Sequence, residues 1–299
     1  MKQLMQRSIR AAMLAATAAA CAMLLSACER VVDITVPDGP TRLVVEGRVE
    51  AVVGRPSGRQ QVILTTTSPY FSQAAAPPAR GAQVSIADET GRVVPLAESA
   101  TAPGHYITED LVARVGGRYT LRIRWQGDDY EAVDTLRPVP PIDSVYFTKR
   151  SFLGFGRPED EDTLPRVTID VRDPAGVSNY YLWDLYVDGQ RVLVSDSVLR
   201  HRAVDTDQYF DGLRIRSYQT HPDTPIRPGQ MVLLRQQSLT EQQYRFYRTL
   251  NDQMIGNGSP FSIPPTSVRG NVANRTRPAV RALGIFLATN VVERSLRAP

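Results

Sequence analysis

The stretch "YTLRIRW" at residues 119–125 decides the fold class that the sequence predicts. Tyrosine, leucine, isoleucine and tryptophan occupy its odd-numbered positions, whereas threonine and arginine occupy the even-numbered ones. Successive side chains of a strand point to opposite faces, so the apolar side chains gather on one face and the polar ones on the other. The pattern is typical of an antiparallel strand with one face buried and one face in water.

Outward from this segment the same alternation recurs, in "AQVSIAD" at residues 82–88 and in "RVTIDV" at 166–171. Turn-forming residues separate the segments. They are Glu89-Thr90-Gly91, Gly127-Asp128-Asp129, Asp173-Pro174-Ala175-Gly176, Asp188-Gly189 and Asp211-Gly212. Short strands with frequent turns predict a mainly β protein made of two antiparallel β-sandwich domains, immunoglobulin-like or transthyretin-like in layout.

A Pro-rich segment, "LRPVPPIDSV" at residues 136–145, predicts the joint between the two domains. Its prolines lack a backbone donor and favour an extended, stiff connection. We therefore expect an N-terminal β-sandwich domain at residues 42–137, the joint at 138–142 and a β-rich C-terminal domain at 143–299.

One helix is expected near residues 239–254, in the C-terminal domain. Ser238-Leu239-Thr240-Glu241 fits a capping box at its start. Apolar side chains then recur at helical spacing, and the turn Asn257-Gly258 ends the segment. These side chains are Tyr244, Tyr247, Leu250 and Met254. The stripe predicts a helix face that packs on a sheet.

The N-terminus has the features of a secretory signal peptide over residues 1–27. Residues 1–10 hold three basic residues and no acid, and residues 11–27 are uncharged and rich in alanine. A membrane-spanning helix is the alternative, disfavoured because the uncharged segment is short and only weakly apolar. Leu25-Ser26-Ala27-Cys28 resembles the bacterial lipobox, whose cysteine is acylated, so we expect a lipid on Cys28 and an acylated tether at residues 28–41.

Removal of residues 1–27 changes what composition implies. Cys21 leaves with the signal peptide, so the mature chain has no pair of thiols for a disulfide or a zinc site. Three of the basic residues leave too, which reduces the formal net charge from +4 to +1. A nearly neutral chain gives no reason to expect nucleic acid as a partner.

No catalytic motif is found in the sequence. The three histidines, His105, His201 and His221, do not have the spacing of a zinc-binding helix, and no G-x-S-x-G nucleophile elbow occurs. We expect no enzyme activity, no cofactor and no metal. The acidic residues 159–162 offer the oxygen ligands that suit calcium, but a solvated loop is the simpler interpretation, and both stay open. The turn Asp211-Gly212 is interpreted as a hairpin turn.

Two loops carry candidate contact residues for a partner or ligand. Tyr70 and Phe71 lie in the Ala/Pro-rich segment 68–81, and Phe261 and Ile263 lie in segment 258–271. Exposed loop aromatics make good binding anchors. The alternative is that these side chains cap a sandwich or cover a sheet edge.

Several longer segments resemble one known family. They include "CERVVDITVPDGPTRLVVEGRV", "LRPVPPIDSV", "VRDPAGVSNYYLWDLYVDG" and "PFSIPPTSVRGNV", in that order along the chain. Together they resemble the Bacteroidota lipoproteins grouped as domain of unknown function 4249. The resemblance implies an outer-membrane lipoprotein of the kind often encoded near TonB-dependent receptors. It implies no catalytic residues.

From these observations we expect a lipid-anchored binding or interaction protein of the outer membrane that is accessory to a TonB-dependent uptake system. Glu29 follows the cysteine where an aspartate would favour the inner membrane, by resemblance to that sorting rule. The periplasmic and surface faces are both open. The alternatives are a structural or adhesion protein of the envelope and, less favoured, a hydrolase of envelope or extracellular polymers.

Overall fold

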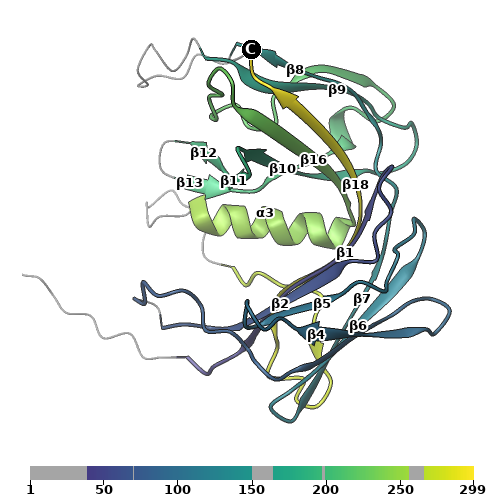
Figure 1. Cartoon of the computed structure of the whole chain (residues 1–299), viewed down its shortest axis with the longest axis vertical. Coiled ribbons are helices and arrows are strands. Elements are labelled where there is room, and N and C mark those ends of the chain that lie inside the picture. Colours follow the sequence, from purple (N-terminus) through teal and green to yellow (C-terminus); the bar gives the residue numbers. More distant parts are fainter. Residues whose placement is uncertain (1–38, 70, 150–163, 197–198, 256–265) are drawn as a thin grey trace, which may run out of the picture. The chain divides into compact units, whose positions relative to one another are not determined.

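The computed structural model describes residues 39–69, 71–149, 164–196, 199–255 and 266–299. Residues 40–299 form one compact unit. Within the described residues it consists of strands and one α-helix, with a single short 3-10 turn (Figure 1). The predicted fold class, mainly β with one helix, is confirmed.

The N-terminal sandwich packs two layers of strands around a shared apolar core. Its strands are β1 (Leu43–Val52), β2 (Gln60–Thr66), β3 (Gln83–Ala87), β4 (Val93–Glu98), β5 (His105–Thr108), β6 (Arg118–Trp125), β7 (Asp128–Thr135) and β17 (Ala273–Asn274). One layer holds β1, β2 and β5, the other holds β3, β6, β7 and β17, and β4 pairs with both β3 and β5. The segment 119–125 is β6, and its tyrosine, leucine and isoleucine are buried as predicted.

The C-terminal sandwich has its own core. Its strands are β8 (Ile142–Thr148), β9 (Arg166–Arg172), β10 (Tyr180–Val187), β11 (Gln190–Val192), β14 (Ala203–Thr206), β15 (Arg214–Tyr218), β16 (Met231–Leu239) and β18 (Leu283–Arg297). The first layer is β8, β9 and β15, and the facing layer contains β10, β16 and β18. A small hairpin of β12 (Val194–Asp196) and β13 (Leu199–His201) precedes β14, and the 3-10 turn Asp207–Tyr209 follows it.

Strand β18 connects the two sandwiches into one continuous sheet, in the order β11-β10-β16-β18-β1-β2-β5 (Figure 1). It pairs antiparallel with β16 and parallel with β1. Phe286 and Ala288 face the N-terminal core, and Val292 and Ala298 face the C-terminal core. The division into domains at 42–137 and 143–299 stays a prediction; the structure shows two sandwiches that share a sheet.

Buried polar side chains fasten the predicted joint to this sheet. Ser238 Oγ donates a hydrogen bond to the Arg137 carbonyl at 2.7 Å, and Gln236 Nε2 donates to the Pro140 carbonyl at 2.8 Å. The Val139 amide donates to Asn290 Oδ1 at 3.2 Å. Side chains of β16 therefore satisfy two carbonyls of this segment, and Asn290 of β18 accepts one of its few backbone N–H donors, since the prolines have none.

The helix α3 (Glu241–Ile255) covers part of the opposite face of the shared sheet. Its cap differs from the prediction. The Gln243 amide donates to Thr240 Oγ1 at 3.4 Å, and the Thr240 amide donates to Gln243 Oε1 at 2.7 Å, so Thr240 and Gln243 form the capping box. Ser238 belongs to β16 instead, because the strand runs to the residue before the cap. Tyr247 is buried against the sheet as expected, whereas Met254 is 38% exposed.

Two predicted turns also differ. The turn between β6 and β7 consists of Gln126 and Gly127, both with positive φ, and Asp128 begins the next strand. The hairpin interpretation of Asp211-Gly212 is wrong, because β14 pairs with β10 whereas β15 pairs with β9 in the other layer. In the described part of the chain, no helix combines the length and apolar character that crossing a membrane requires.

Candidate functional site

The structure describes only some of the residues that the sequence predicts as contact or lipidation sites. Cys28, Tyr70, Phe261 and Ile263 lie outside the described residues, as does the acidic segment 159–162. The side chain of Phe71 is described and is 63% exposed, so it does not cap the sandwich core. Its role as a contact residue stays a prediction.

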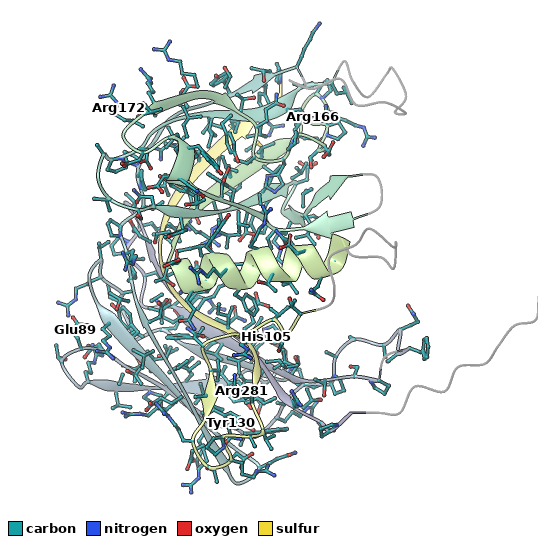
Figure 2. The ribbon with its side chains drawn as sticks, turned by 180° about the vertical axis from the view of Figure 1, so that it is seen from behind. Glu89, His105, Tyr130, Arg166, Arg172 and Arg281 are labelled. Atoms are coloured by element: carbon teal, nitrogen blue, oxygen red, sulfur yellow. The ribbon has the colours of Figure 1, made fainter. Side chains whose placement is uncertain are left out.

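The histidines are distributed over the chain. His105, labelled in Figure 2, lies in β5 with its Nδ1 2.7 Å from Gln61 Nε2. His221 is buried in the segment between β15 and β16, and its Nδ1 lies 2.9 Å from Thr220 Oγ1. The His201 side chain is not described. The two described histidines therefore belong to different sandwiches.

Three aspartates from distant parts of the sequence come together beside β9 and β15. Oxygens of Asp173, Asp207 and Asp211 lie within 4.8 Å of one another. Each carboxylate accepts a backbone N–H, from Gly212, Asn179 and Gly176 respectively. Burial and the two neighbouring carboxylates raise the pKa of Asp173, outweighing its hydrogen bonds. These hydrogen bonds fasten the turn after β9 to the loop before β15. The three carboxylates therefore have a structural role.

A larger group of charges lies on the face of the shared sheet that also carries α3. We call it the ion-pair network. It comprises Glu46, Arg48, Glu50, Asp184, Arg202, Arg235 and Glu293. Glu46, Arg48 and Glu50 of β1 lie opposite residues 285, 287 and 289 of β18, and cross-strand partners share a face.

Short contacts connect the members of this network. Arg235 donates to Glu50 Oε2 at 2.5 Å and to Glu293 Oε1 at 2.9 Å. Asp184 accepts from Arg202 and, at 2.8 Å, from Gln237 Nε2. Arg48 Nη1 lies 3.7 Å from Asp184 Oδ2. The ion-pair network thus joins β1 of one sandwich to β10 and β16 of the other.

The arginines of the ion-pair network keep two of its carboxylates, Asp184 and Glu50, charged. Burial would raise the pKa of Asp184, but Arg202 and Arg48 outweigh that effect and lower it to about 2. Burial likewise opposes ionisation of Glu50, and Arg235 and Arg48 nevertheless hold its pKa below the usual value. Arg48 Nη2 is buried and has no hydrogen-bond acceptor in the described part of the chain. A polar cavity of about 280 Å³ opens beside Arg48, Glu50 and Arg235.

A second charged region lies at the start of β1, where the described chain begins. Among the described residues, a pocket of about 490 Å³ is lined by four arginines and by no aspartate or glutamate. We call it the basic pocket, defined by Arg42, Arg269, Arg275 and Arg281. Arg275 reaches Glu131 at 2.7 Å, whereas the guanidinium groups of the other three have no hydrogen-bond or ion-pair partner among the described residues.

Two glycines explain how these arginines come together. A Cβ on Gly270 would lie 1.7 Å from the Gly284 carbonyl oxygen, and one on Gly284 would lie 2.0 Å from the Val45 carbonyl oxygen. Only glycine permits such close approach of three backbones. Asn271 then hydrogen-bonds both the amide and the carbonyl of Phe286, at 2.9 and 2.8 Å. Segment 268–271 is therefore held against β18, and it lines the same pocket as Arg281, which Figure 2 labels.

The fold and these regions define a class: a mainly β protein of two sandwiches on a shared sheet, whose described part has one region of paired charges and one basic pocket. The chain belongs to the family described as Domain of unknown function (DUF4249), whose model matches residues 29–295. This confirms the family that the sequence segments resembled. Among curated proteins, none matches the chain in sequence.

Proposed function

We propose that the protein is a lipid-anchored binding protein of the outer membrane that works beside a TonB-dependent uptake receptor. The observation that carries the proposal is the lipobox-like Leu25-Ser26-Ala27-Cys28 after an uncharged segment. Acylation there would hold the sandwiches at the membrane through residues 28–41. At about 3.3–3.6 Å per residue this tether spans at most about 50 Å.

The described residues support binding more than catalysis. The ring of His105 contacts the side-chain amide of Gln61. In a catalytic triad a carboxylate occupies this place and orients the histidine as a base, which a neutral amide does not do. The aspartates beside β9 are engaged with backbone amides. A structural or adhesion protein would have the same lipid anchor and the same fold. Only the identity of its partner distinguishes this alternative from the uptake role.

The test is gentle detergent extraction of native outer membranes that contain the tagged protein, followed by purification and identification of what accompanies it. We expect a TonB-dependent barrel in stoichiometric amount. The matched control is Cys28→Ser, which lacks the acylated thiol and should lose the barrel together with the membrane. Recovery of the acylated protein alone contradicts the uptake role and favours the adhesion alternative.

A further inference from the structure

We propose that the basic pocket is a binding site for a phosphate group, carried by a lipid headgroup or by a small soluble phosphate compound. The pocket does not depend on acylation of Cys28. A failure of this proposal and a failure of the anchor are therefore separate results.

The first argument is the charge of the lining. Four arginines border the pocket, and among the described residues the acid in contact with them is Glu131, which pairs with Arg275 from outside the lining. Arg42, Arg269 and Arg281 keep their donors free of protein acceptors among the described residues. Like charges that share a concave site repel one another, and a bound anion relieves that repulsion.

The second argument is the contrast with other exposed arginines of the same sandwich. Arg59 reaches Glu109 at 2.6 Å, Arg114 reaches Glu89 at 3.2 Å, and Arg277 reaches Asp128 at 2.6 Å. Elsewhere on the surface of this sandwich, arginines thus form ion pairs with nearby carboxylates. Their absence from the lining of the basic pocket leaves the charge for a ligand.

The third argument concerns the kind of anion. The arginine guanidinium is a planar fork of donors that matches phosphate oxygens in pairs. Three free forks provide more donors than one carboxylate accepts, whereas a phosphate offers several oxygens and up to two negative charges. Glycines at 270 and 284 fix the backbone behind Arg269 and Arg281, so the segments that carry these side chains are in place before a ligand arrives.

The experiment compares three forms of the mature chain, purified in a neutral detergent. They are the wild type, the variant R42Q/R269Q/R281Q, and the control R118Q/R172Q/R216Q. The control removes the same charge from exposed arginines outside the pocket. Calorimetric titration with inorganic phosphate and with glycerol 3-phosphate forms one arm. Titration with phosphatidylglycerol in mixed micelles, against phosphatidylcholine, forms the other.

We expect the wild type and the control to bind, and the pocket variant to bind at least about tenfold more weakly. Binding of the soluble compounds assigns the site to phosphate itself. Binding of phosphatidylglycerol alone assigns it to a lipid headgroup. The proposal is overturned if no probe binds the wild type. It is also overturned if the control loses as much affinity as the pocket variant, since net charge would then account for the binding.

Discussion

The ion-pair network and the basic pocket contain the same kind of side chain in opposite circumstances. Arg48, Arg202 and Arg235 are only 15%, 11% and 13% exposed, and each contacts at least one carboxylate. Arg269 and Arg281 are exposed and contact none among the described residues. A buried charge has to be paired, whereas an exposed one has water as an alternative. The comparison therefore separates arginines that stabilise the fold from arginines that remain available to a ligand.

The largest effect is expected in the ion-pair network. Asp184→Asn would leave Arg48 and Arg202 without their buried carboxylate, so we expect the free energy of unfolding to fall by about 3–5 kcal/mol. Urea unfolding measures it. Glu109→Gln breaks the exposed pair with Arg59 and serves as control, with a loss below about 1 kcal/mol. Equal losses in the two variants would remove the distinction between buried and exposed pairs.

A buried acid that has no ion-pair partner among the described residues provides the second prediction. Asp134 accepts the Ala288 amide at 2.5 Å and a donor from Gln243, and burial raises its pKa to about 6. The folded chain therefore holds a proton that the unfolded chain releases from about pH 4 upward. This contribution to stability is present below pH 4 and is lost as the pH rises through 6, by about 3 kcal/mol.

The measurement is unfolding free energy at a series of pH values, for the wild type and for Asp134→Asn. The variant cannot titrate at this position, so its stability should change less between pH 4 and 7. Asp184 differs in sign: its pKa of about 2 means that its contribution is present above pH 4 and lost towards pH 2. If the free energy of unfolding changed equally with pH in the wild type and in Asp134→Asn, the loss of stability between pH 4 and 6 could not be assigned to Asp134.

The smallest effect on stability is expected in the basic pocket. R42Q/R269Q/R281Q removes no protein contact of the guanidinium groups, so the free energy of unfolding should stay within about 0.5 kcal/mol of wild type or rise slightly as repulsion is relieved. Thermal unfolding without added phosphate is the measurement. A clear loss of stability would mean that these arginines support the fold, as those of the ion-pair network do.

Local patterns in the sequence predicted most of the fold. The alternation in "YTLRIRW" is reproduced residue by residue in β6, and the apolar stripe of α3 packs on a sheet. The parallel pairing of β1 with β18 was not predicted, because it joins segments from opposite ends of the chain and no local pattern encodes the partner of a strand. The expected capping box was displaced by two residues because Ser238 satisfies the joint instead.

The ion-pair network and the basic pocket were harder to predict from the sequence than the strands and the helix. "EGRVE" at residues 46–50 alternates charges on one face of β1, a pattern that is also typical of a strand face in water. Its partners, Asp184 and Arg235, come from strands that only the tertiary structure brings alongside. The basic pocket likewise depends on the close approach of Gly270 and Gly284, which no spacing in the sequence reveals.

The proposed role requires that the chain is held at the outer membrane, so the anchor is the central claim. The most direct test is mass spectrometry of the N-terminal peptide of the protein extracted from the outer membrane. The account predicts a peptide that begins at Cys28 and carries a diacylglycerol on its thiol, and its absence in Cys28→Ser. A peptide that begins elsewhere and bears no lipid would contradict it.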